Sequence, residues 1–165
     1  MTIRLLAAAL AVTFGTTANA ALWTLSGNMD PLQAGTNGGF GAGTGNGNGT
    51  IAGTYDDVTN EINYEIVWAD LTSPTTVSHF HLGAPGSSGG VTLGFTPTSP
   101  SIGNATLTEA QETDLLAGNW YVNIHTTNYP GGEIRGQVNA VIPEPGSLAL
   151  LGLGGLLVAR RRRRA

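Results

Sequence analysis

Two short stretches in which apolar and polar residues alternate constrain the fold most. Residues 61–68 read EINYEIVW and residues 120–126 read WYVNIHT, so that every second side chain is apolar. A period of two places the apolar side chains on one face of a β-strand and the others on the opposite face. Similar short runs, separated by turn residues, recur along the chain and indicate seven or so strands. The pattern predicts an all-β, antiparallel sandwich or small barrel.

The strands can be placed approximately from the same pattern. We expect them over residues 22–27, 49–55, 61–68, 77–83, 91–95, 120–126 and 132–141. Residues 57–60 (DVTN) are turn formers, so the second and third strands should form a hairpin. Thr108 and Gln111 match a capping box, which predicts one short helix of about nine residues that ends at Gly118.

Charge and cysteine content exclude several classes of protein. Between residues 21 and 142 the chain has ten acidic residues and one basic residue, Arg135. Such a surface repels phosphate backbones, so we expect no nucleic-acid partner. The chain has no cysteine, which rules out a disulfide scaffold, a thiolate zinc site and a thiol enzyme.

Residues 1–20 have the pattern of a secretory signal peptide. Arg4 provides the positive start, residues 5–14 are mainly apolar, and residues 18–20 read Ala-Asn-Ala. Small residues in this A-x-A arrangement mark a cleavage site. We therefore expect export, with cleavage between Ala20 and Ala21 and a folded domain over residues 21–142.

The C-terminus has three parts in order. Pro143, Glu144 and Pro145 form a rigid break, residues 147–159 are apolar, and residues 160–164 are all arginine. As a separate hydrophobic helix, the apolar segment would rise about 20 Å, less than the roughly 30 Å hydrocarbon core. Local thinning of the bilayer can cover such a deficit. The arginines predict a transmembrane helix with its basic end in the cytoplasm.

This arrangement over residues 143–165 resembles the PEP-CTERM sorting tail of Gram-negative bacteria. The resemblance implies an exosortase-type processing enzyme as a partner. It also implies export across the inner membrane, transient membrane anchoring, and then a location at the cell surface or outside the cell.

The three histidines are the candidate site residues. His79 and His81 share one face of their strand, and His125 lies on the polar face of another. If the last strands are neighbours, these residues, Glu133 and Arg135 form one cluster. Imidazoles with a carboxylate suit zinc or copper. A hydrogen-bonded polar cluster without metal is the alternative, in which Arg135 pairs with Glu133 or a neighbouring carboxylate.

Several segments together resemble the CHRD (chordin-type) domain. They are residues 79–85 (HFHLGAP), the helix region 107–118, and residues 120–137, which contain YVNIHT and PGGEIRGQ. The resemblance implies an immunoglobulin-like β-sandwich with no established catalytic activity, so we expect no catalytic residues and no required cofactor. The family takes its name from an animal extracellular protein that binds growth factors.

Two functions remain open. The first is an exported, non-enzymatic protein of the cell envelope or extracellular matrix, with a polysaccharide or matrix protein as its partner. The second is a zinc- or copper-binding β-domain. The H-x-H strand also resembles the copper strand of copper/zinc superoxide dismutase, and suggests a superoxide-dismutase-like sandwich. The chain lacks the disulfide of that enzyme and enough histidines for its two-metal site.

The signal peptide predicts the N-terminus of the exported protein. N-terminal sequencing of secreted material should begin at Ala21, because signal peptidase cuts after the small residue that ends the A-x-A site. Full-length protein recovered from the cytosol, starting at Met1, would contradict the signal peptide.

Overall fold

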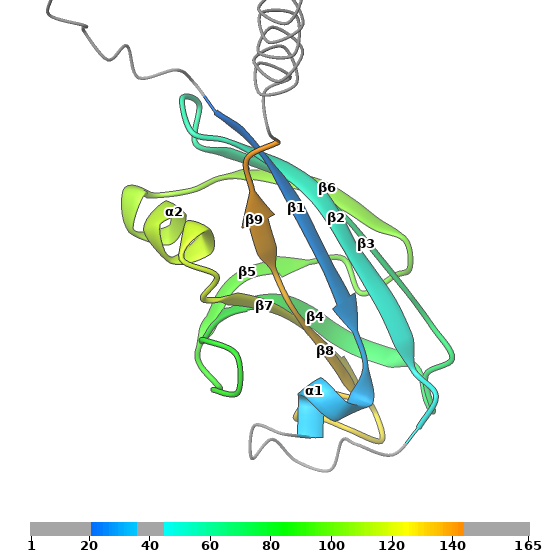
Figure 1. Ribbon diagram of the computed structural model, residues 1–165. Coiled ribbons are helices and arrows are strands. Elements are labelled where there is room, and N and C mark those ends of the chain that lie inside the picture. Colours follow the sequence, from blue (N-terminus) through cyan, green and yellow to red (C-terminus); the bar gives the residue numbers. More distant parts are fainter. Residues whose placement is uncertain (1–20, 36–44, 144–165) are drawn as a thin grey trace, which may run out of the picture.

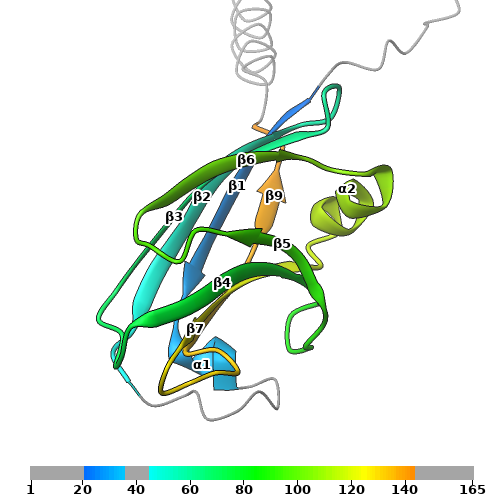
Figure 2. The same ribbon diagram turned by 180° about the vertical axis from the view of Figure 1, so that it is seen from behind.

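The computed structural model describes residues 21–35 and 45–143, which form two antiparallel β-sheets packed face to face (Figures 1 and 2). One sheet has five strands in the order β6-β3-β2-β1-β9, and the other has four in the order β5-β4-β7-β8. The predicted all-β sandwich is confirmed. The elements are β1 (Leu22–Met29), α1 (Pro31–Gly35), β2 (Asn48–Asp56), β3 (Glu61–Ala69), β4 (Thr75–Leu82), β5 (Val91–Phe95), β6 (Ser101–Thr106), α2 (Glu109–Leu116), β7 (Trp120–Thr126), β8 (Ile134–Gln137) and β9 (Asn139–Val141).

The apolar core lies between the two sheets. It combines the inward-facing side chains of both sheets with residues from α2 and the segment before it. Burial of this apolar surface is the main favourable contribution to folding. The buried core residues are Leu25, Met29, Ile51, Tyr55, Ile62, Ile66, Trp68, Phe80, Leu107, Leu115, Trp120, Val122, Ile124, Ile134 and Val138.

Local sequence determines the β2–β3 hairpin and the start of α2. The Asp56 carboxylate accepts hydrogen bonds from the backbone N–H groups of Val58 (2.9 Å) and Thr59 (3.1 Å), and Asn60 adopts a positive φ of 56°. Both features are typical of tight turns. Thr108 and Gln111 form the expected capping box.

The last predicted strand, 132–141, is wrong as a single element. The structure divides it into β8, at the edge of the four-stranded sheet, and β9, at the edge of the five-stranded sheet. Between them the Val138 N–H donates to the Trp120 carbonyl at 2.9 Å, and the Val138 side chain is fully buried. Apolar residues at positions 134, 138 and 140 keep the same parity across the break. Alternation alone therefore could not reveal that the chain changes sheets.

Two elements lie in stretches for which the sequence pattern predicts no helix or strand. Strand β6 has little apolar alternation because it is an edge strand, with Ile102 74% exposed. Helix α1 is a single short turn in which the Asp30 side chain accepts from the Gln33 N–H at 2.8 Å. The described residues thus contain two short helices, where one was expected.

No helix within 21–35 and 45–143 is long and apolar enough to span a membrane. The signal peptide over 1–20 and the predicted helix over 147–159 lie outside the described residues.

Strand β7 is buried on both faces. Its seven residues are all buried, although only one face meets the apolar core. The opposite face carries Tyr121, Asn123 and His125. The loop between β4 and β5 covers part of it, because Arg135 on the neighbouring strand β8 donates to the carbonyl of Ser87 in that loop. The polar face is therefore an interior surface, and its polar groups need partners within the protein.

Glu133 is a fully buried carboxylate directly before β8. It accepts hydrogen bonds from the Thr72 backbone N–H (2.6 Å), the Thr72 hydroxyl (3.0 Å) and the Thr126 hydroxyl (2.7 Å). These bonds tie the β3–β4 connection to the end of β7.

We expect Glu133→Ala to lower the free energy of unfolding by about 2–4 kcal/mol. The substitution leaves three donors without their acceptor, the buried Thr126 hydroxyl and the part-buried N–H and hydroxyl of Thr72. Loss of an acceptor costs about 1–3 kcal/mol for a buried donor, and water compensates part of the loss at Thr72. Chemical denaturation would measure the change. Glu133→Gln is the matched control, because it keeps one carbonyl oxygen and should lose less than half as much. Equal losses in the two variants would contradict the role given to these hydrogen bonds.

Candidate metal centre

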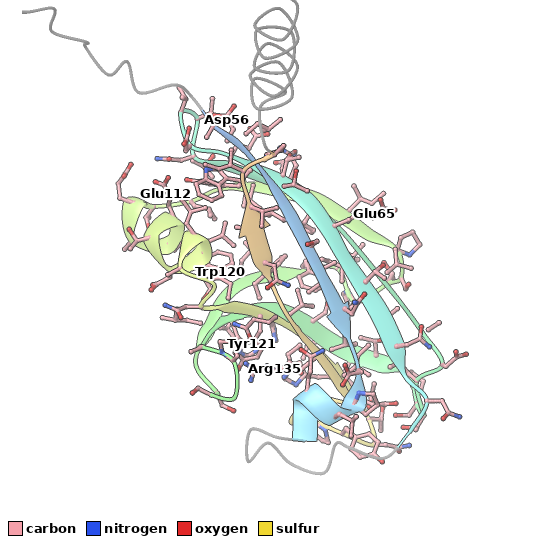
Figure 3. All side chains as sticks on the ribbon, viewed as in Figure 1. Asp56, Glu65, Glu112, Trp120, Tyr121 and Arg135 are labelled. Atoms are coloured by element: carbon pink, nitrogen blue, oxygen red, sulfur yellow. The ribbon has the colours of Figure 1, made fainter. Side chains whose placement is uncertain are left out.

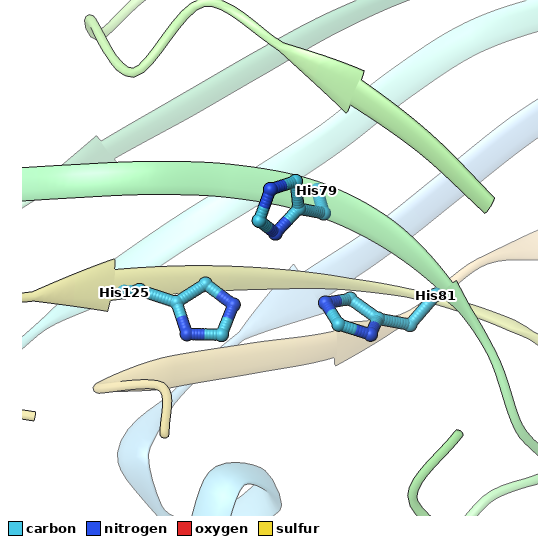
Figure 4. A group of neighbouring side chains, drawn as sticks. All are labelled: His79, His81 and His125. Atoms are coloured by element: carbon cyan, nitrogen blue, oxygen red, sulfur yellow. The ribbon is translucent and has the colours of Figure 1, made fainter. Parts of the chain in front are cut away.

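The antiparallel pairing of β4 and β7 brings the three histidines together. His79 and His81 lie two residues apart on β4, and His125 on β7 pairs with Val77, diagonal to His79. Figure 4 shows the three rings projecting from these strands toward a common point. The ring centroids are 5.5 Å apart for His79–His81, 5.3 Å for His79–His125 and 5.7 Å for His81–His125.

The ring nitrogens have the spacing of potential metal ligands. One nitrogen of each histidine lies within 4.8 Å of the other two. Metal–nitrogen bonds of about 2.0–2.1 Å place the ligand nitrogens of a tetrahedral site about 3.3 Å apart. Small rotations of the three side chains would therefore be enough to close the triangle around one ion.

Backbone carbonyls determine the tautomers of two of the rings. Nδ1 of His81 lies 3.0 Å from the Gly89 carbonyl oxygen, and Nδ1 of His125 lies 2.8 Å from that of Pro130. A carbonyl oxygen only accepts, so each Nδ1 must carry a proton, and in the neutral form of each ring Nε2 is then the unprotonated nitrogen. Metal-binding histidines are oriented in the same way, by a hydrogen bond from the ring nitrogen that does not bind the metal.

Two nitrogens of the cluster are buried without a hydrogen-bond partner. They are Nδ1 of His79 and Nε2 of His81. Nε2 of His125 has only a long contact, 3.4 Å, with the side-chain amide of Asn123. Buried polar atoms in native proteins almost always have partners. An ion bound between the rings would provide one for all three nitrogens.

The environment also favours the neutral, metal-binding form of His79 and His81. His81 and His125 are buried and His79 is half-buried. Burial lowers the pKa of His79 and of His81 below the usual imidazole value, and the nearby His125 lowers both further. For His81, the hydrogen bond with Gly89 opposes part of this decrease in pKa. Neutral imidazole is the form that coordinates a metal.

The other two residues of the predicted cluster occupy different positions. The Arg135 guanidinium carbon lies 3.4 Å from the centroid of the Tyr121 ring, and that ring stacks on His81 at 5.0 Å. Figure 3 shows Tyr121 and Arg135 in this region of the sandwich. The carboxylate of Glu133 is hydrogen-bonded to Thr72 and Thr126. The expected pairing of Arg135 with Glu133 is wrong, because the guanidinium bonds neutral oxygens of the β4–β5 loop and of Gln137.

Sequence reasoning missed the groups that orient the histidines. The carbonyls of Gly89 and Pro130 are backbone atoms, so no residue type in the sequence marks them. Tyr121 and Asn123 share the strand face of His125, and that parity was the one signal that could have placed them beside the cluster.

The residues on which the predictions for the two termini rest lie mostly outside the described part of the chain. Of the sorting motif, Pro143 is described and exposed, whereas Glu144 and Pro145 are not described. On the two sides of the expected cleavage site, Ala20 is not described, whereas the Ala21 backbone nitrogen donates to the Asp57 carboxylate at 2.8 Å.

Two family models match the chain. The CHRD domain matches residues 24–138, and the PEP-CTERM protein-sorting motif matches residues 141–164. No curated protein and no solved structure matches the chain. The sorting motif implies an exported protein that undergoes membrane-associated processing by an exosortase-type enzyme in a Gram-negative bacterium. Since the CHRD model covers more than two thirds of the sequence, the chain belongs to the CHRD domain family and carries a C-terminal PEP-CTERM sorting motif.

Proposed function

We propose that the CHRD domain of this exported protein binds one zinc or copper ion through His79, His81 and His125. The observation that carries the proposal is the convergence of three ring nitrogens, two of them buried without a partner. A polar cluster whose purpose is only structural would satisfy these nitrogens with protein donors.

The ligand types favour zinc and copper over other ions. Imidazole nitrogen is a borderline-soft donor that suits both, whereas calcium and magnesium prefer oxygen ligands. Within the described part of the chain, the cluster offers three protein ligands. A fourth coordination position would then be open to water or a small ligand.

The sorting motif supports a function in which the metal site is displayed outside the inner membrane. We propose that the processed protein is retained at the cell envelope or in the extracellular matrix. There it would capture metal and contact an envelope polysaccharide or matrix protein. In this proposal the protein is not an enzyme. The domain captures the ion, and the bound ion orders the residues around it.

Metal binding by the purified protein is the direct test. We expect one zinc or copper ion per chain, and a loss of affinity of roughly 100-fold or more in His81→Ala. Removal of one of three protein ligands should exceed the 10–100-fold cost of losing an outer-shell partner. Equilibrium dialysis with metal analysis would measure both values. Glu65→Gln is the control, since Glu65 is an exposed acid on the other sheet. Any change in metal binding in this variant would report non-specific binding only.

Thermal unfolding provides a second measurement on the same proteins. At free metal about 100 times the Kd, binding to the native state adds about 2.7 kcal/mol of stability, which raises the Tm of a domain of this size by about 10 °C. A chelator should reverse the increase. A wild-type Tm that does not respond to zinc or copper, together with unchanged binding in His81→Ala, would refute the metal centre.

The location can be tested by deletion of the tail. Without residues 143–165 we expect the domain to appear in the culture medium. The shortened protein lacks both the motif for the processing enzyme and the apolar segment that would anchor it in the membrane. Fractionation and immunoblotting would show the change. Deletion of residues 36–44 is a control that leaves the tail intact. Continued association of the tail-deleted domain with the envelope would point to a different anchor.

A further inference from the structure

Arg135 is a buried cation next to the proposed metal centre. It is the one basic residue between positions 21 and 142, and its side chain is 3% exposed. Burial of a guanidinium carries a substantial desolvation cost, which a carboxylate partner usually offsets. The hydrogen bonds of Arg135 within the described structure go instead to three neutral oxygens. Packing alone therefore does not explain why Arg135 is buried at this position.

Arg135 and its neighbour Gln137 hold the loop between β4 and β5. Nη1 of Arg135 donates to the Ser87 carbonyl at 2.7 Å, and Nη2 donates to the Ala84 carbonyl at 3.3 Å. The Gln137 side-chain amide donates to the Gly83 carbonyl at 2.9 Å and accepts from Nη2 of Arg135 at 3.2 Å. The planar guanidinium presents several donors in a fixed geometry, so it can fix two loop carbonyls at once.

The same loop supplies the acceptor that orients His81. The Gly89 carbonyl accepts from Nδ1 of His81 at 3.0 Å, and the Gly89 N–H donates to the Tyr121 hydroxyl at 3.2 Å. Arg135 therefore reaches His81 by two routes. One runs through the loop, and the other through the Tyr121 ring, which contacts the guanidinium and stacks on His81 with an interplanar angle of 13°.

We infer that Arg135 is a positioning residue for the metal centre. By holding the loop, it keeps the Gly89 carbonyl where it selects the Nδ1–H tautomer of His81, and this tautomer leaves Nε2 free to bind the ion. The inference rests on the proposed metal-binding function. It adds that the charge and shape of Arg135 set metal affinity without contact between Arg135 and the ion.

Substitution of Gly89 offers a way to displace the loop without any change at Arg135. A Cβ at Gly89 would collide with the Leu82 carbonyl oxygen, whereas a Cβ at Gly90 would meet no atom within 4 Å. Gly89→Ala should shift the Gly89 carbonyl away from His81. Gly90→Ala is a matched control in the same loop.

The test combines two measurements on the wild type, Arg135→Met, Arg135→Lys, Gly89→Ala and Gly90→Ala. The first is the tautomer of His81 in the metal-free protein, from the imidazole ¹⁵N chemical shifts. The second is Cu²⁺ binding, with the number of coordinating nitrogens taken from the hyperfine pattern in electron paramagnetic resonance. A merely structural role for Arg135 would change neither measurement in variants that fold.

We expect the wild type and Gly90→Ala to show the Nδ1–H tautomer and three coordinating histidine nitrogens. Arg135→Met and Gly89→Ala should show mixed tautomers of His81 and a 10- to 100-fold loss of Cu²⁺ affinity, the range for outer-shell partners. Arg135→Lys should fall between, because it retains the charge but has no planar fork.

The outcomes separate this inference from the proposed function. A wild type that binds no Cu²⁺ and no Zn²⁺ overturns the metal centre, and with it the positioning role. Three-nitrogen binding of equal affinity in the wild type and in Arg135→Met, with the same tautomer, overturns this inference alone. If Arg135→Met does not fold, the comparison of Gly89→Ala with Gly90→Ala decides, and equal tautomers and affinities in that pair overturn the inference.

Discussion

Strand β7 is buried on both faces, and one of these faces is polar. The apolar face completes the core, but Tyr121, Asn123 and His125 on the other face lie beneath covering segments. Burial of polar atoms is costly unless each finds a partner, so this face requires a network of hydrogen bonds rather than simple packing. The β4–β5 loop, strand β8 and the segment before β8 provide that network.

Most of the network is complete, and the exceptions cluster. Loop carbonyls accept from Arg135 and His81, and the Pro130 carbonyl accepts from His125. The nitrogens left over on His79 and His81 point into the same small volume. This sheet face satisfies most of its hydrogen-bonding groups, but leaves the two imidazole nitrogens and the neighbouring Oδ1 of Asn123 without partners. Adjacent imidazole nitrogens with free lone pairs are organised for a ligand that accepts lone pairs. That is the physical basis for the proposed metal centre.

The same arrangement explains why Glu133 and Arg135 have separate roles despite their closeness in sequence. Glu133 lies before β8 begins, where the chain passes Thr72 and Thr126. Arg135 lies within β8, opposite Asn123, and extends over Tyr121 toward the loop. Two residues of the same parity thus serve different neighbours, because one precedes the regular strand and the other belongs to it.

The sequence by itself determined the strands with clear alternation, the hairpin turn at residues 57–60, the capped helix and the shared face of His79 and His81. These are local properties, since each depends on residues a few positions apart. Only the tertiary structure decided that β7 lies beside β4, which brings His125 to that pair. It also decided that the chain changes sheets at Val138, and that the carbonyls of Gly89 and Pro130 select the tautomers. Strand order and backbone carbonyl positions depend on contacts between distant segments, and no residue type in one segment encodes them.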